Sequence, residues 1–489
     1  MKVSVIGSGF SGLSASAVLA KAGYQVEVFE KNSQPGGRAR KFTEKGFTFD
    51  MGPTWYWLPD VFEKFFSHFG KTPGDYYKLY RLDPSYRMFF GKDDYIDVPS
   101  ENEELYSLFE KLEPGSSKNL RKFLSEAAFK YNLAMKEIIY MPSLSFREYL
   151  NWAIISGVLS VNFFKPISKY IRSLFRNEKI IRILEFPVIF LGAAPANTPS
   201  LYSMMNHADL TLGTWYPEGG MYEVINALVK LNEELGVKIN LNEPVTEFTY
   251  HNHKINEVIT SAKAHKTQAV IAGADYQFID QQVIDPDYSE YSPQYWNSRK
   301  MAPSALLFYI GLDKSVDGLE HHNLFFDTDF EKHAGEIYKS PKWPSNPAFY
   351  VSVSSKTDKS SAPQGGENLI ILIPVASGLE DSETIKEQYF KMVITRLEYL
   401  LKESISKHTI YKRLYGASNF INDYNSFKGN AYGLSNTLLQ TAFLKPKMRS
   451  SKLSNLFYCG QLTVPGPGVP PSIISGEIAA RLVIKNLKV

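Results

Sequence analysis

The chain has 489 residues and a mass of 55.4 kDa, more than one ordinary hydrophobic core holds, so two or three domains are expected. Its net charge of +3 argues against a dedicated nucleic-acid-binding protein. A single cysteine, Cys459, excludes an internal disulfide framework, and with nine scattered histidines it leaves no zinc pattern, so no metal is expected.

The N-terminus predicts a nucleotide-binding turn. Residues 2–6 read as a strand with no leader ahead of it, and residues 13–22 read as a helix. Between them lies a GxGxxG motif, Gly7-Ser8-Gly9-Phe10-Ser11-Gly12. Gly7 permits the turn, Gly9 lets a pyrophosphate approach the backbone, and Gly12 lets helix and strand pack closely. The helix N-terminus offers unpaired N–H groups to the phosphates.

A second strand at residues 25–29 ends at Glu30-Lys31, where the Glu30 carboxylate is placed to accept hydrogen bonds from an adenosine ribose. Six residues later Gly36 and Gly37 allow close backbone approach, and Arg38 is suited to neutralise a pyrophosphate. The segment Gly52-Pro53-Thr54 follows. These residues resemble the FAD-binding fingerprint of the amine-oxidase and carotenoid-desaturase superfamily, which implies FAD as the cofactor.

The middle of the chain predicts an α/β fold built from discontinuous pieces. Residues 116–183 are mostly helical by their 3.6-residue period, whereas residues 304–312, 349–353 and 368–376 read as strands of a mixed sheet covering the flavin's reactive face. We expect a discontinuous Rossmann-like FAD-binding domain, a mixed β-sheet substrate domain and a helical membrane-associating subdomain. Their expected ranges are 1–75, 215–290 and 445–489 for the first, 76–115 and 291–444 for the second, and 116–214 for the third.

Near the C-terminus a strand at residues 455–459 ends in Gly460-Gln461, and a loop rich in glycine and proline precedes a helix that begins near Ser472. This loop, which contains Gly468-Val469-Pro470, predicts a stiff backbone cradle whose N–H groups face the O2 edge of an isoalloxazine ring.

Taken together, the GxGxxG, PGGRA, FDMGP, YPxGGM and PGxGxP segments resemble the bacterial phytoene desaturase family, most closely its flavobacterial type, over nearly the whole chain. The resemblance implies hydride transfer from a C40 carotenoid, phytoene or a related acyclic carotene, to flavin N5, with quinone or oxygen as the final electron acceptor. It also implies that the backbone of Val245 meets the adenine. Gln461 departs from the superfamily, which commonly has an aspartate there for the ribitol.

The polar candidates for catalysis are Arg147 and Glu148, which resemble the family's Ser-Phe-Arg-acidic segment; the alternative is a surface ion pair. Aromatic residues such as Trp55 and Trp57 either line a polyene tunnel or pack into the core. His321 and His322 are expected to be surface or loop residues rather than ligands.

A membrane contact is predicted from five basic residues at helical spacing, Lys165, Lys169, Arg172, Arg176 and Lys179. They would share one helix face next to the apolar stretch 152–164, which suits an anionic lipid surface; a solvated helix face is the alternative. No segment is long enough to span a bilayer. The expected location is cytoplasmic, peripherally bound to the inner face of the cell membrane.

Other functions remain open at this point. A 1-hydroxycarotenoid 3,4-desaturase or a carotene ketolase would share the flavin motifs, and so would an amine oxidase. A carotenoid-binding flavoprotein without turnover is the alternative from another functional class.

Overall fold

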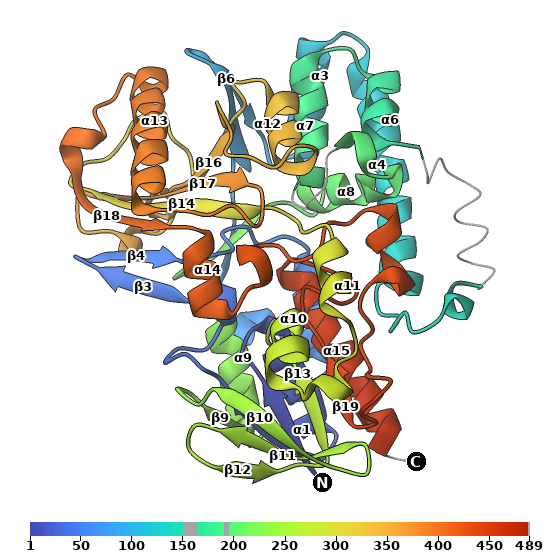
Figure 1. Ribbon diagram of the computed structural model, residues 1–489. Helices are drawn as coiled ribbons and strands as arrows, with labels where there is room; N and C mark the ends of the chain where they lie inside the picture. Colours follow the sequence, from blue (N-terminus) through green and yellow to red (C-terminus); the bar gives the residue numbers. More distant parts are fainter. Residues whose placement is uncertain (151–164, 190–194, 488–489) are drawn as a thin grey trace.

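The computed structural model describes residues 1–150, 165–189 and 195–487. Both termini lie at one end of the molecule, beside a parallel sheet (Figure 1). A larger mixed sheet lies at the other end, flanked by a group of helices. The α/β class and the discontinuous nucleotide-binding unit expected from the sequence are confirmed, whereas the exact domain boundaries stay a prediction.

The parallel sheet has the strand order β19-β13-β1-β2-β9. Its strands are β1 (Lys2–Ile6), β2 (Gln25–Phe29), β9 (Lys238–Asn240), β13 (Ala269–Ala272) and β19 (Leu456–Tyr458). The inner strands β1 and β13 are short apolar runs with nearly every residue buried, as expected where helices cover both faces of a parallel sheet. Helix α1 (Phe10–Lys21) packs along α15 (Val469–Leu487), which joins the two ends of the chain.

A seven-stranded mixed sheet has the order β18-β14-β17-β16-β15-β6-β7. Its strands are β6 (Tyr86–Gly91), β7 (Asp94–Val98), β14 (Ser304–Leu312), β15 (His322–Phe325), β16 (Phe349–Ser352), β17 (Glu367–Val375) and β18 (Thr409–Tyr415). All pairs are antiparallel except β15 with β6. The three strands predicted from sequence are confirmed as β14, β16 and β17.

The two faces of the seven-stranded sheet are covered differently. Helix α13 (Glu383–Leu401) packs Val393 and Leu397 against one face. The hairpin of β3 (Lys41–Glu44) and β4 (Phe47–Asp50) packs aromatic rings against the other. This hairpin follows the Gly36–Arg38 segment, so the mixed sheet is tied directly to the nucleotide-binding unit.

The helical layer contains α3 (Asn102–Leu112), α4 (Ser116–Leu133), α6 (Ile167–Leu174), α7 (Glu178–Ile189) and α8 (Met204–Leu210) (Figure 1). None of the helices in the described ranges combines the length and the apolar composition that crossing a bilayer requires. The remaining smaller elements near the site are α9 (Tyr222–Glu234), β10 (Val245–His251), α10 (Tyr276–Phe278) and α14 (Ala417–Tyr424).

The predicted basic helix face is wrong. Helix α6 ends at Leu174 because Phe175 has an extended backbone, and the chain becomes helical again only at Glu178. The stripe is therefore divided between two helices and the link between them. Two of its members also form ion pairs, Arg172 with Glu178 and Lys179 with Asp94. The apolar stretch 152–164 lies outside the described residues.

Candidate active site

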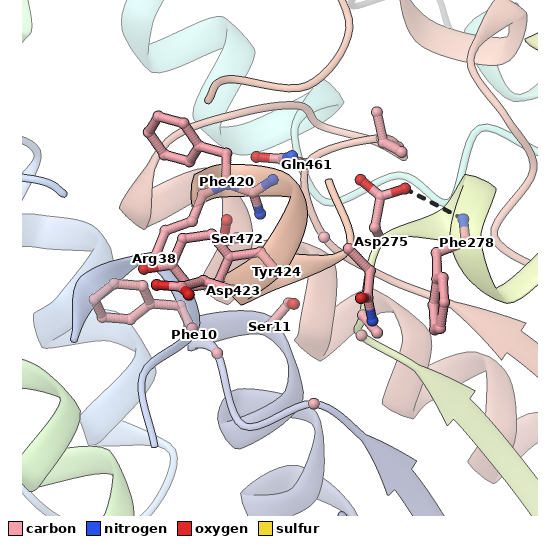
Figure 2. Close-up of a pocket in the computed structure, with 18 of the residues that line it drawn as sticks. Phe10, Ser11, Arg38, Asp275, Phe278, Phe420, Asp423, Tyr424, Gln461 and Ser472 are labelled. Carbon is pink, nitrogen blue, oxygen red and sulfur yellow. Dashed lines mark hydrogen bonds between the residues drawn. The ribbon is translucent and has the colours of Figure 1, made fainter. Parts of the chain in front are cut away.

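A cavity of about 650 Å³ extends from the carboxyl ends of β1 and β2 to β14 and β17 of the mixed sheet. This volume is in the range of sites that bury most of a small-molecule ligand. Figure 2 shows the side chains that surround it, with Phe10 and Ser11 at the start of α1 and Gln461 and Ser472 from the C-terminal segment. Segments far apart in the sequence therefore converge on one hollow.

Most of the residues predicted to bind the cofactor line this cavity. They are Gly7, Gly9, Phe10, Ser11, Glu30, Lys31, Gly36, Gly37, Arg38, Gly52, Pro53, Val245, Gly460, Gln461, Gly468 and Val469. Four predicted residues, Ser8, Gly12, Thr54 and Pro470, are not among the lining residues. Helix α15 begins at Val469, three residues before the predicted start, so Pro470 belongs to its first turn.

The glycines of the first turn have separate roles. A Cβ at Gly9 would have no atom within 4 Å, so its backbone borders open space in the cavity wall. A Cβ at Gly12 would lie 2.0 Å from the carbonyl oxygen of Gly7, so Gly12 is needed for packing between helix and strand, as predicted. A Cβ at Gly52 would lie 2.2 Å from the carbonyl oxygen of Arg38, which forces these two segments into backbone contact.

The Glu30 carboxylate lines the cavity, yet the protein already supplies it with four donors. Its Oε2 accepts hydrogen bonds from the Ser8 backbone N–H at 3.0 Å and from the Ser8 hydroxyl at 2.8 Å. Its Oε1 accepts from the backbone and side-chain nitrogens of Asn32 at 2.9 and 3.0 Å. Glu30 therefore holds the turn in shape, and a ribose hydroxyl must replace or share one of these bonds.

Arg38 is a partly buried cation in the cavity wall. Its Nη2 donates to the Ser426 hydroxyl at 2.9 Å, while its Nε is buried and has no hydrogen-bond partner among the described residues. A guanidinium with a free N–H fits a pyrophosphate, and the glycines before it let a phosphate approach the backbone. The described residues thus fit the phosphate part of FAD.

Two acidic residues of the cavity were missed by the sequence analysis. Asp275 follows β13, accepts hydrogen bonds from the Phe278 and Phe427 backbone N–H groups at 3.3 Å each, and faces Arg38 across the cavity (Figure 2). Burial raises the pKa of Asp275 to about 6, against the lowering effect of Arg38. Asp423 lies on α14 and pairs with Arg40 at 2.5 Å. The usable signal was the glycine and aspartate directly after the apolar run 269–272.

The C-terminal segment contacts the cavity through its backbone and one amide. The Gln461 side chain donates to Asn430 Oδ1 at 3.0 Å, so in this chain the amide connects the loop to residues 430–433. Gly460 and Gly468 have positive φ values of 100° and 116°, which favour glycine. A ribitol contact from Gln461 stays a prediction.

The end of the cavity next to the mixed sheet is apolar. Ala305 and Leu307 from β14, Leu372 from β17, and Ala431 with Tyr432 form this part of the wall. These five side chains include no carboxylate, histidine, lysine or arginine. The cavity therefore combines polar lining residues suited to a dinucleotide with an apolar part of the wall suited to a hydrocarbon.

His321 and His322 were expected to be surface or loop residues, but both are buried: His322 lies in strand β15, and His321 lies in the loop directly before it. His322 Nδ1 is 2.6 Å from the Tyr350 hydroxyl, which is 2.9 Å from the Thr54 hydroxyl. Burial holds the pKa of His322 well below its usual range, so the imidazole is neutral. Thr54, predicted as a cofactor contact, instead connects the Gly52-Pro53 segment to the mixed sheet.

The aromatic residues predicted either to form a tunnel or to pack into the core do not line the cavity. Trp57 and Tyr56 are buried in hydrophobic clusters, Tyr216 is also buried, and Trp55 stacks on His322 at 3.9 Å between ring centroids. Of the two alternatives, the structure therefore supports core packing for these aromatic residues.

Arg147 and Glu148 are not brought to the cavity. The Glu148 carboxylate accepts hydrogen bonds from the backbone N–H groups of Ser143, Leu144 and Ser145 at 2.8–3.1 Å, which closes the turn before residues 146–149. This geometry accounts for Glu148 as a local capping residue. A catalytic role for the pair stays a prediction that the cavity does not support.

Comparison with known proteins shows the family to which the chain belongs. The model of the family "Flavin containing amine oxidoreductase" matches residues 10–484. A carotenoid 3,4-desaturase of Haloarcula japonica is 39% identical over 487 residues, covering 99% of this chain and 98% of the relative. A 4,4′-diapophytoene desaturase (4,4′-diaponeurosporene-forming) of Staphylococcus aureus is 31% identical over 501 residues, covering 100% and 99%.

Among solved structures, an oxidoreductase from Methanosarcina mazei has the same fold, with a TM-score of 0.64 at 17% identity and coverage of 97% of this chain and 99% of that one. The family match covers Arg38 and the C-terminal loop of the cavity, together with the end of the glycine turn from Phe10 onward. The chain therefore belongs to the flavin-containing amine oxidoreductase family, together with these carotenoid desaturases, and is an FAD-dependent oxidoreductase.

Proposed function

We propose that the protein desaturates a carotenoid with FAD as its redox cofactor, in carotenoid biosynthesis. The observation that carries this proposal is the relationship to carotenoid desaturases over essentially the full length of both chains. The apolar end of the cavity supports it, because a polyene offers no polar groups for recognition and needs an apolar wall.

The chain's own residues bind the cofactor, orient it and exclude water from the reacting atoms. Arg38 and the N-terminus of α1 would hold the dinucleotide phosphates, and the loop 460–468 would contact the ring system. When bound, FAD supplies the two-electron oxidation that converts a carbon–carbon single bond of the substrate into a double bond. Ala305, Leu307 and Leu372 keep that region dry, which protects the reaction from competing hydration.

The bond that is oxidised has two candidates. The sequence analysis favoured phytoene or a related acyclic carotene. The carotenoid 3,4-desaturase is 39% identical to this chain, whereas the diapophytoene desaturase is 31% identical. The higher of these two identities supports a substrate oxidised at the 3,4 position. A 3,4-desaturation is therefore the second candidate that we retain.

The test is product analysis of the purified holoenzyme with phytoene, lycopene and a 1-hydroxycarotenoid in separate anaerobic reactions. Bleaching of the flavin together with a product two hydrogens lighter, resolved by HPLC and mass spectrometry, is expected with one of them. Reoxidation by oxygen or by a soluble quinone then identifies the electron acceptor. Binding of every carotenoid without flavin bleaching or product would support a non-catalytic carotenoid-binding flavoprotein instead.

We further propose that the protein meets its water-insoluble substrate as a peripheral protein on the inner face of the cell membrane. The support is an exposed apolar patch, which we define as Phe146, Leu150, Leu439, Phe443 and Leu444. Phe146 is 56% exposed and still contacts Phe443, with ring centroids 5.4 Å apart, so two distant segments form one surface. Arg147 adds a positive charge beside it, which suits anionic lipid.

The apolar patch is tested by sedimentation with vesicles of phosphatidylcholine and phosphatidylglycerol. The double variant Phe146→Asp, Phe443→Asp is expected to lose most of its binding, because carboxylates do not enter the lipid interface. Tyr399→Asp is the matched control, since Tyr399 is 61% exposed on α13 in another part of the molecule. Equal sedimentation of the double variant and the control would contradict the proposal.

A further inference from the structure

Lys445 is a buried ammonium group that the described chain leaves without a partner. The residue is 4% exposed, and its Nζ forms no hydrogen bond or ion pair with the described residues. The neighbouring Lys447, by contrast, is exposed. A buried ammonium is costly unless another group compensates it, so the missing partner requires an explanation.

A second unpaired polar atom lies on the same side of the loop. Asn436 is 5% exposed, and its Oδ1 also has no hydrogen-bond partner among the described residues. Lys445 Nζ and Asn436 Oδ1 lie 3.3 and 3.4 Å from the position that a Cβ would occupy at Gly466. Gly466 has a φ of 137°, a value that L side chains rarely adopt, so the two groups converge on a point where the loop has no side chain.

Gly466, Lys445 and Asn436 do not themselves line the cofactor cavity, but the next two residues, Pro467 and Gly468, do, and α15 begins at Val469. The N-terminus of this helix offers N–H groups in the same part of the wall. An ammonium donor and an amide acceptor therefore lie behind the loop that is expected to contact the ring system of FAD.

We propose that Lys445 and Asn436 form a polar site for the pyrimidine edge of the flavin, in which Lys445 binds the reduced ring more tightly than the oxidised ring. Reduction places electron density and negative charge on the pyrimidine ring, and a nearby ammonium stabilises that charge in a low-dielectric interior. Burial lowers the pKa of Lys445 to about 8, which still leaves the ammonium form in the majority at pH 7. Lys445 is a positioning and charge-stabilising residue that raises the reduction potential, whichever substrate the enzyme takes.

The test measures the midpoint potential of bound FAD by dye-equilibrated anaerobic reduction, without any carotenoid. Lys445→Met is expected to lower the preference of the site for reduced over oxidised FAD at least tenfold, which is about 30 mV for a two-electron couple. Lys445→Arg keeps the charge and is expected to remain close to wild type. Lys447→Met is the control, because it removes an exposed positive charge two residues away.

Asn436→Asp provides an independent variant of nearly the same shape. It adds a carboxylate that pairs with Lys445 and opposes the negative charge of the reduced ring, so the potential is expected to fall in the same direction. The proposal would be overturned if the midpoint potential of bound FAD in Lys445→Met and in Asn436→Asp equalled that of the control, Lys447→Met. An unchanged potential with slower reoxidation by oxygen would also overturn it and assign the site to the electron acceptor.

Discussion

Alanine substitutions at Gly9 and Gly12 are expected to separate cofactor binding from folding, although the two glycines are only three residues apart. Gly9 has a φ of −74°, which alanine adopts without strain, and a Cβ there meets no protein atom within 4 Å. Gly9→Ala is therefore expected to leave the apoprotein as stable as wild type, or more stable by about 0.4–1 kcal/mol because the unfolded chain loses entropy.

The added methyl group at Gly9 occupies the space that a pyrophosphate needs to reach the backbone. A hydrogen bond to a charged group contributes about 1.5–3 kcal/mol, so the loss of one such bond corresponds to about 10- to 150-fold weaker FAD binding. Gly12→Ala is different, because its Cβ would lie 2.0 Å from the Gly7 carbonyl oxygen, where an ordinary contact begins at 3.4 Å. Such overpacking between backbone atoms costs about 1–3 kcal/mol or more and destabilises the apoprotein directly.

The assay combines thermal unfolding of both apoproteins with fluorescence titration of FAD. Gly9→Ala is expected to keep the melting temperature of the wild-type apoprotein and to show a raised dissociation constant for FAD. Gly12→Ala is expected to lower the melting temperature of the apoprotein. Wild-type FAD affinity for Gly9→Ala, or a wild-type melting temperature for Gly12→Ala, would refute the assignment of the two glycines.

Three further predictions concern buried polar groups. Arg38→Met is expected to weaken FAD binding about 10-fold or more in the same titration, because it removes the unpaired Nε–H and the charge; unchanged affinity would exclude a phosphate contact. Burial raises the pKa of Asp209 from 3.8 to about 7, so the folded protein holds this proton more tightly than the unfolded chain, and stability falls as the pH rises through that interval. Asp209→Asn keeps an acceptor for Tyr86 and is expected to remove that fall, which is at most about 3 kcal/mol between pH 5 and pH 8 in urea unfolding; parallel pH profiles would contradict this. Tyr350→Phe leaves the His322 and Thr54 groups unpaired and is expected to cost about 1–3 kcal/mol in thermal unfolding, and a neutral effect would show that water replaces the hydroxyl.

The phosphate part of the site was predictable because its residues are consecutive. Three local patterns carry it: the Gly7–Gly12 turn, Glu30 and the Gly36–Arg38 segment. The glycines in them are required by backbone geometry that neighbouring residues impose. Some strands of both sheets, such as β1, β14 and β17, were predictable for a similar reason, since apolar runs rich in β-branched and aromatic residues indicate buried strands.

Residues that enter the site from distant elements were not predictable in this way. Asp423 has no motif around it, and Asp275 has only the glycine that follows the apolar run 269–272. The pairing of β13 with β1 and the position of α14 bring the two residues to the cavity. His322 is buried because β15 is an inner strand between β16 and β6, and no local sequence pattern predicts that position in the sheet.

The prediction of a basic stripe was wrong because it assumed that one helix continues through residues 165–179. An extended residue at Phe175 separates α6 from α7, and only the packing of these helices against their neighbours decides that break. Helical periodicity predicts a shared face only as far as the helix itself continues.

The amino-acid sequence by itself determined the cofactor class and the α/β framework of this protein, since a dinucleotide turn is specified by short-range backbone geometry. The tertiary structure alone decided which buried atoms of charged side chains have no hydrogen-bond partner among the described residues, Arg38 Nε and Lys445 Nζ among them. The physical reason is that the partner of a buried charge is chosen by long-range packing, and burial makes the absence of a partner costly.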